Sequence, residues 1–89
     1  MTEKYKYFLN KNCFCEEIDD SLFILHSETG QYHEVNGSGK QIIKMLDSNK
    51  LSIDEIISNG NQSKYNFKKY DVIKFIEQLI KREIISFKE

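Results

Sequence analysis

The fold is decided by one stretch of the chain, Glu28-Thr29-Gly30-Gln31-Tyr32-His33-Glu34-Val35-Asn36-Gly37-Ser38-Gly39. Gly30 ends a turn, where a left-handed backbone conformation costs glycine little. From Gln31 to Asn36 the side chains alternate as in a strand, so Gln31, His33 and Val35 are expected on one face. The glycines that follow change the period from 2 to 3.6 and begin a helix. A strand that ends in such a corner is easily left at the edge of a sheet.

Two further strands precede this one. Cys13 to Ile18 has the composition of a strand, Asp19 and Asp20 supply a turn, and Ser21 to His26 returns as the next strand. Consecutive apolar residues in the returning strand predict a central position with both faces buried. Together the segments predict a three-stranded antiparallel meander whose third strand is Gln31 to Asn36.

Two short helices are expected next. The first begins after Asn36 and presents one apolar face to the core. The second has the clearest start, because Ser52 and Glu55 match a capping box, in which each side chain bonds the backbone amide of the other. Asn59-Gly60 is expected to end this second helix. A polar connection with Tyr65 and Phe67 as anchors leads on from there.

The third helix is the longest and runs roughly from Lys69 to Arg82. Ile73 and Phe75 flank its apolar arc on opposite sides, and the surplus width forms either a groove wall or a broad core face. Residues 84–87 add a short strand or pack irregularly. Three strands followed by three helices predict an α+β, winged-helix-like domain over residues 12–88, with residues 1–11 as a tail or an extra strand.

Composition limits the classes to which the protein can belong. The chain has 89 residues and a formal net charge of -1, which suits a single small globular domain and disfavours a dedicated nucleic-acid binder. No apolar run approaches the ~20 residues that span a bilayer. The first residues lack the apolar segment of a secretion signal. A cytoplasmic protein that does not enter a membrane is therefore predicted.

Neither a catalytic nor a metal site is predicted. Cys13 and Cys15 are poorly spaced for a disulfide along a strand and lack the Cys-x-x-Cys spacing of zinc sites, so free thiols are expected. No motif pairs these thiols with His26 or His33 as nucleophile and base. Gly37-Ser38-Gly39 lacks the third glycine of a dinucleotide-binding turn, so no cofactor is expected. The prediction is a protein that is not an enzyme.

Two kinds of binding protein fit a chain without catalytic residues. A winged-helix DNA-binding regulator would use the third helix for recognition, with lysines such as Lys69 and Lys74. The chain has only one arginine, and Asp71 and Glu77 add acid to the same helix, which disfavours this alternative. A peptide-binding protein would use the third strand, because an open strand edge accepts an extended peptide.

The ordered residues also resemble a known family. The resemblance rests on Glu28-Thr29-Gly30-x-Tyr32-x-x-Val35-Asn36-x-x-Gly39, Ile42 with Leu46, Ser52-Ile53-x-Glu55-Ile56, and Asp71-Val72-x-x-Phe75-Ile76-x-x-Leu79. These segments are similar to the PqqD-like domain, also called the RiPP recognition element, over about residues 13–85. Glu83 departs from the family pattern, because glycine often stands at this position before the last apolar pair.

The resemblance implies a non-catalytic chaperone for ribosomally made, post-translationally modified peptides. Family members bind the precursor's leader segment as an extra strand and deliver the precursor to a modifying enzyme, such as a radical SAM enzyme, or to a leader peptidase or cyclase. Carried over to this chain, the peptide-binding residues are Gln31, Tyr32, His33, Glu34 and Val35 in the strand and Lys69, Val72, Ile73 and Ile76 in the third helix. A proline at His33 is then expected to abolish binding without unfolding the domain. An unfilled edge also allows two copies to pair as a homodimer.

Overall fold

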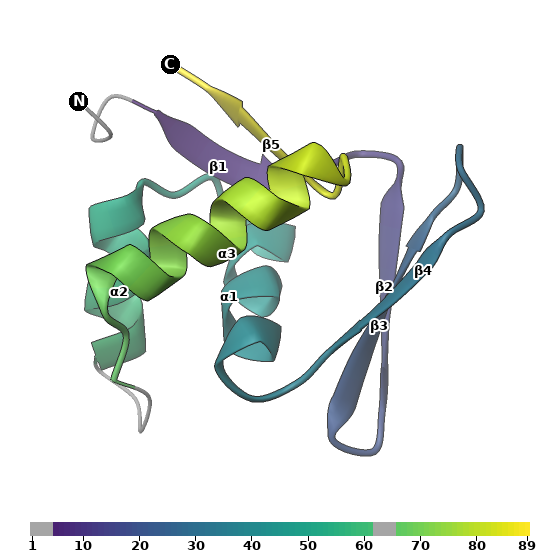
Figure 1. Cartoon of the computed structure of the whole chain (residues 1–89), viewed down its shortest axis with the longest axis horizontal. Helices are drawn as coiled ribbons and strands as arrows, with labels where there is room; N and C mark the ends of the chain where they lie inside the picture. The colour runs from purple at the N-terminus through teal and green to yellow at the C-terminus, as the bar shows by residue number, and fades with distance from the viewer. Residues whose placement is uncertain (1–4, 62–65) are drawn as a thin grey trace.

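The computed structural model describes residues 5–61 and 66–89, which form two small sheets and three helices (Figure 1). The strands are β1 (Lys6–Leu9), β2 (Cys13–Ile18), β3 (Ser21–His26), β4 (Tyr32–Val35) and β5 (Ile85–Lys88), and the helices are α1 (Gly37–Ser48), α2 (Ile53–Asn61) and α3 (Lys69–Lys81). The meander followed by three helices confirms the predicted α+β class. No helix in the described ranges is long and apolar enough to cross a membrane. Tyr65, predicted as an anchor, lies outside the described residues.

The central strand of the larger sheet is β3, in the antiparallel order β2-β3-β4. Its Leu22, Ile24 and His26 side chains are buried, whereas Phe23 and Leu25 are only partly buried. The prediction that both faces of this strand are buried is therefore wrong. The reason is visible in Figure 1, where α1, α2 and α3 all lie on one side of the sheet. We call the opposite side, which no described helix covers, the outer face.

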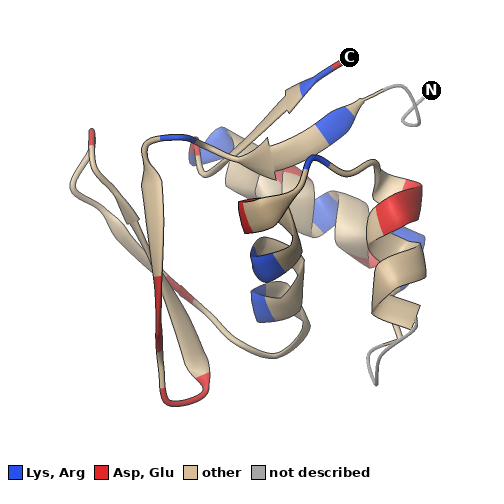
Figure 2. Cartoon of the chain, turned by 180° about the vertical axis from the view of Figure 1, so that it is seen from behind, with Lys and Arg blue, Asp and Glu red and all other residues tan. Residues whose placement is uncertain are grey.

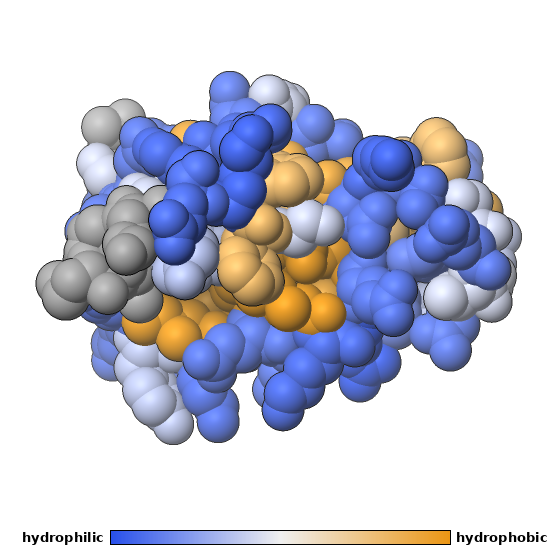
Figure 3. Space-filling view, turned by 90° about the horizontal axis from the view of Figure 1, so that it is seen from above, coloured by the Kyte–Doolittle hydropathy of each residue, from blue (hydrophilic) through white to orange (hydrophobic). Residues whose placement is uncertain are grey.

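A second sheet joins the two ends of the chain. β1 pairs antiparallel with β5, and Tyr7 lies opposite Phe87. Tyr7 also exchanges backbone hydrogen bonds of 2.7 and 2.9 Å with Leu51, which precedes α2. Figure 3 views this side of the molecule, where exposed apolar side chains gather in the middle and hydrophilic ones surround them. The division into a tail of residues 1–11 and a domain of residues 12–88 stays a prediction.

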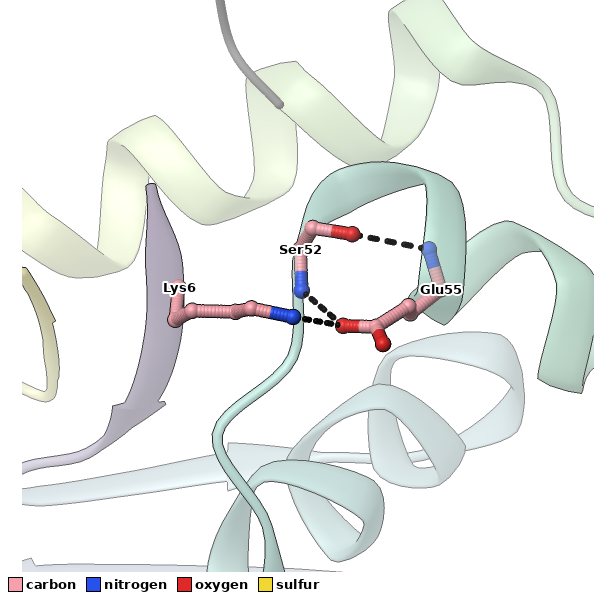
Figure 4. A network of polar contacts seen from close by, with 3 residues as sticks. All are labelled: Lys6, Ser52 and Glu55. Atoms are coloured by element: carbon pink, nitrogen blue, oxygen red, sulfur yellow. Dashed lines mark hydrogen bonds and ion pairs between the residues drawn. The ribbon is translucent and has the colours of Figure 1, made fainter. Parts of the chain in front are cut away.

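Local chemistry fixes the start of α2. The Glu55 N–H donates to Ser52 Oγ at 3.2 Å, and the Ser52 N–H donates to Glu55 Oε1 at 2.8 Å, so the predicted capping box is confirmed. Lys6 Nζ of β1 lies 2.7 Å from the same carboxylate oxygen (Figure 4). The hydrogen bond from Lys6 is the main cause of a lowered pKa of Glu55, and the bond from the Ser52 backbone is the second. One carboxylate thus caps α2 and ties β1 to it.

The end of α2 differs from the prediction. The helix continues through Gly60 to Asn61, so Asn59-Gly60 does not stop it. Gly60 is buried, and a Cβ added there would lie only 1.8 Å from Cδ2 of Phe67. The missing side chain lets the Phe67 ring pack against the helix backbone. This glycine serves packing rather than termination, and its partner lies beyond the helix.

The end of α3 is a tight turn into β5. The Glu83 N–H donates to the Ile80 carbonyl at 3.0 Å and the Ile84 N–H to the Leu79 carbonyl at 2.9 Å. This pair of bonds is a Schellman motif, which places Glu83 at the position usually held by glycine. Glu83 accordingly has a φ of 63°, in the left-handed region. The departure from the family pattern is therefore a site of backbone strain.

Candidate functional site

The phase of the β3–β4 ladder decides which backbone groups β4 offers to a partner. The His26 N–H donates to the Gln31 carbonyl at 3.0 Å. Antiparallel strands alternate between residue pairs that exchange hydrogen bonds and pairs that do not. Ile24 and His33 are therefore the next bonded pair in the register, and Val35 belongs to the one after it. The amides of His33 and Val35 point inward, to β3.

The other residues of β4 point their backbone groups outward. The N–H and C=O groups of Tyr32 and Glu34 lie on the edge away from β3, and in the described part of the chain no strand pairs with that edge. A proline at His33 would remove a donor that β3 uses, so it is expected to destabilise the sheet and would not test the open edge alone. Glu34, whose N–H points outward, is the position at which proline tests the edge.

The side chains of β4 alternate between the two faces of the sheet. His33 and Val35 are half-buried on the side of the helices, whereas Tyr32 is 69% exposed and Glu34 is also exposed. This pattern confirms the predicted alternation. Gln31 precedes β4 and is exposed. A strand added to the edge would thus send every second side chain toward the helices and the others to the outer face.

One flank of α3 forms the opposite wall of this site. A Cβ built on Gly39 would lie 3.1 Å from two ring atoms of Phe75 and 3.9 Å from Cβ of Val35. Because it lacks a side chain, Gly39 brings the start of α1, the end of β4 and the Phe75 flank of α3 close together. The pKa of His33 is lowered mainly by burial and, as the second cause, by the positive charge of Arg82. The flank from Phe75 to Arg82 therefore runs beside β4.

A cavity extends the site beyond the Val35 end of β4. Its volume is about 340 Å³, and it lies between the first turn of α1 and the start of α3. The residues around it are Ser38, Gly39, Ile42, Asn66, Phe67, Lys68, Asp71, Val72 and Phe75. Apolar and polar side chains therefore share its wall about equally, with Lys68 and Asp71 as the charged members. Its size suits one or two side chains of an extended peptide.

The helix residues proposed from the sequence occupy different places. Val72 and Ile76 are each 2% exposed and belong to the core, although Val72 also lines the cavity. Lys69 is directed to α2, because its Nζ lies 3.9 Å from Asp54 Oδ1. Ile73 lies about 160° around the helix from Phe75, at 3.6 residues per turn. The structure brings Phe75 to β4, and it sets Ile73 and Lys69 on other sides of α3.

Phe75 is the residue that the sequence-based site leaves out. Its signal is present in the sequence, since Phe75 flanks the apolar arc opposite Ile73 and Gly39 indicates a close approach. Helical periodicity alone does not show which of the two flanks of a helix faces the sheet. Only the contact between Gly39 and Phe75 shows which flank faces β4.

The thiols of the chain are in their unreactive form. Burial raises the pKa of Cys13, and chiefly burial raises the pKa of Cys15 to about 11, so both are protonated near neutral pH. His26 is buried, and its Nδ1 accepts long hydrogen bonds from the N–H groups of Glu28 and Thr29. Within residues 5–61 and 66–89, no three His, Cys, Asp or Glu side chains are placed to hold a metal ion.

Comparisons with known proteins identify one sequence family and two solved structures that share this fold. The sequence model of a family described as coenzyme PQQ synthesis protein D (PqqD) matches residues 21–85. The structure of TbiB1 in complex with the TbiA(beta) leader peptide is 23% identical, with a TM-score of 0.74, and the match covers 89% of this chain and 94% of that one. A lasso peptide synthetase B1 complexed with the leader peptide is 14% identical, with a TM-score of 0.74 and coverage of 90% and 96%. No curated protein matches the sequence.

Proposed function

Because the chain belongs to the PqqD family, whose sequence model spans residues 21–85, we propose that it binds the leader segment of a ribosomally made, post-translationally modified peptide. The observation that carries this proposal is the open edge of β4, where no strand among residues 5–61 and 66–89 pairs with the outward backbone groups of Tyr32 and Glu34. The TbiB1 and lasso peptide synthetase B1 structures, each a complex with a leader peptide, support it.

The leader adds to the sheet as a fourth strand beside β4. Backbone pairing with Tyr32 and Glu34 supplies affinity with little demand on sequence, and side-chain pockets supply specificity. Residues of the leader that point to the helices pack against Val35 and Phe75, and one of them enters the cavity that Val72 helps to line.

The remaining residues of the sequence-based site contribute indirectly. Gln31 and His33 hold β4 to β3, and Ile76 supports the helix from the core. Lys69 and Ile73 lie on other sides of α3, so their replacement by alanine is expected to change leader affinity less than Phe75→Ala does. This order of effects would distinguish a groove lined by Phe75 from the groove at Ile73 that the sequence predicts.

The protein acts as a carrier rather than a catalyst. Its thiols are protonated near neutral pH, which leaves no activated nucleophile among them. It works in the cytoplasm, where it delivers the precursor to a modifying enzyme, such as a radical SAM enzyme, or to a leader peptidase or cyclase. Holding the leader keeps the rest of the precursor at a high effective concentration near that enzyme. In the absence of peptide, the same edge is open to a second copy of the chain.

A titration followed by amide chemical shifts tests the proposal. Isotope-labelled protein is mixed with synthetic peptides that copy the first segment of each short reading frame found near its gene, as trial leaders. The largest shifts are expected at the amides of Tyr32, Glu34 and Phe75. The matched control is the same leader with alternate amides N-methylated, which blocks strand pairing and keeps every side chain. Shifts confined to β1 or α2, or equal binding of the methylated leader, would overturn the proposal.

DNA binding is tested in parallel. Duplex DNA is mixed with the protein at low salt, where contacts to phosphate are strongest. No retardation is expected, because acidic residues interrupt the lysines of α3. Retardation that disappears steeply with added salt would favour the winged-helix regulator instead.

A further inference from the structure

The outer face of the three-stranded sheet presents two rows of side chains that end at β4. The first row is Phe14, Leu25 and Tyr32, and the second is Glu16, Phe23 and Glu34. Phe14 is 61% exposed and Tyr32 is 69% exposed. Residues opposite one another on neighbouring strands share a face and touch. A peptide strand paired with β4 would therefore extend each row by one side chain.

The three-stranded meander and the turns beside it carry only acidic charge. Residues 12–39 contain six Asp or Glu residues and no Lys or Arg, although the whole chain has 13 basic residues. In Figure 2 the strands of the meander carry red and no blue, whereas the helices carry both colours. Acidic side chains at the edge of a sheet favour an incoming strand that carries positive charge.

Glu34 is the acidic residue that an incoming strand meets. Its Oε2 accepts a hydrogen bond of 2.6 Å from Ser21 Oγ of β3, which holds the carboxylate on the outer face. Among the described residues, no lysine or arginine forms an ion pair with it. A cation on the neighbouring peptide strand would supply the missing partner.

From this juxtaposition we propose that Glu34 is a specificity-determining residue, which selects peptides carrying Lys or Arg two positions away from an aromatic or β-branched residue. The inference rests on the proposed function and adds to it the chemistry of the peptide. The aromatic or β-branched side chain packs on Tyr32 and lengthens the apolar row. The cation pairs with Glu34 and ends the acidic row.

The spacing follows from strand geometry. Tyr32 and Glu34 share the outer face and present their backbone groups to the same edge. The two peptide residues that face them are therefore two positions apart, whichever way the peptide runs. One direction of the peptide gives the order aromatic-x-basic and the other gives basic-x-aromatic. The residue between them points to the helix side, toward Phe75.

Selection from a displayed library of random dodecapeptides tests the inference. The library is panned in parallel on the wild-type chain, Glu34→Gln and Glu16→Gln. Glu16 is the matched control, because it lies in the same row on β2, two strands from β4 and thus about 10 Å away. Enrichment of Lys or Arg two positions from an aromatic or β-branched residue is expected on the wild type and on Glu16→Gln, and is expected to disappear on Glu34→Gln.

Affinities of one selected peptide then measure the pair directly. The peptide and its Lys→Gln variant are titrated against wild type and Glu34→Gln in a double-mutant cycle. A coupling of about two- to fivefold in affinity is expected, which is the range for a cross-strand ion pair. The coupling is expected to shrink with added salt, since both side chains are exposed.

The outcomes separate this inference from the proposed function. Peptides that shift the Tyr32 and Glu34 amides but bind Glu34→Gln as well as wild type would overturn the role of Glu34 and leave leader binding intact. Equal loss of binding in Glu16→Gln would show a diffuse effect of charge and would also overturn it. Failure of every selected peptide to shift those amides would overturn both proposals.

Discussion

Proline substitutions in β4 can distinguish the backbone hydrogen bonds that join β4 to β3 from those that β4 offers to a peptide. The His33 N–H points to β3, and the Glu34 N–H points to the open edge. His33→Pro leaves the Ile24 carbonyl without its donor inside the sheet, which costs about 1–3 kcal/mol of the free energy of unfolding. Glu34→Pro removes a donor on the edge side, a change that edge strands tolerate. The residue before a proline is driven to extended backbone, which His33 already has.

The two substitutions are expected to change different measurements. With a urea dependence of about 1–3 kcal/mol per molar, His33→Pro lowers the unfolding midpoint by about 1 M. Glu34→Pro changes that midpoint little. For the leader, loss of one hydrogen bond costs about 0.5–1.5 kcal/mol, and the proline ring takes the place of the peptide's acceptor. Glu34→Pro should therefore weaken leader binding about tenfold or more, which corresponds to about 1.4 kcal/mol.

Fluorescence anisotropy of a labelled leader and urea unfolding of the free protein give the two numbers. Glu34→Ala is the control, because it removes the carboxylate and keeps the backbone N–H. Binding by Glu34→Pro that equals that of Glu34→Ala would refute strand pairing at β4. An unchanged urea midpoint for His33→Pro would refute the assigned phase of the ladder.

Three further predictions concern stability. Gly60→Ala is expected to destabilise the fold by about 1–3 kcal/mol in urea, because the new Cβ would lie 1.8 Å from the Phe67 ring, which outweighs the helix preference of alanine; a more stable variant would contradict this. Glu83→Gly is expected to stabilise the protein by about 1 kcal/mol and raise its melting temperature, since φ is 63° there; a lower melting temperature would count against the strain. The lowered pKa of Glu55, bonded to Lys6, contributes stability that is present above the unfolded pKa and is lost as pH falls through the folded pKa. The urea midpoints of wild type and Glu55→Gln should therefore converge in acid, and a constant difference from neutral to acid pH would disprove the linkage.

Local sequence patterns predicted the structure correctly where the interacting residues are close to one another in the chain. The capping box of Ser52 and Glu55 is complete within one helical turn, so its spacing alone predicts both hydrogen bonds. The alternation along β4 likewise depends only on strand geometry. The prediction that Gly60 ends α2 was wrong because the residue that decides its role is not close in the chain. A glycine near the end of a pattern indicates a stop, and only the distant Phe67 ring turns it into a packing site.

The site required knowledge of contacts that the sequence does not contain. The arc of α3 has two flanks, and the sequence-based site places the groove at Ile73, although Gly39 approaches α3 at Phe75. The pairing of β1 with β5 joins the two ends of the chain, and no turn signal links them. Long-range pairing depends on the whole fold rather than on neighbours in the chain. The edge strand could therefore be predicted, but the wall that faces it could not.

The acidity of the meander also bears on which strand occupies β4. An open edge accepts a second copy of the chain as readily as a peptide, as far as the backbone is concerned. Two copies paired antiparallel about His33 would set Tyr32 of each opposite Glu34 of the other, since only these residues offer outward backbone groups. Glu34 of each copy would then lie diagonally across from Glu34 of its twin, about 7–8 Å away, and like charges repel over about 8–10 Å at moderate salt. A leader with Lys or Arg opposite Glu34 is attracted instead. The charge on Glu34 that disfavours self-pairing would therefore favour a basic peptide at the same edge.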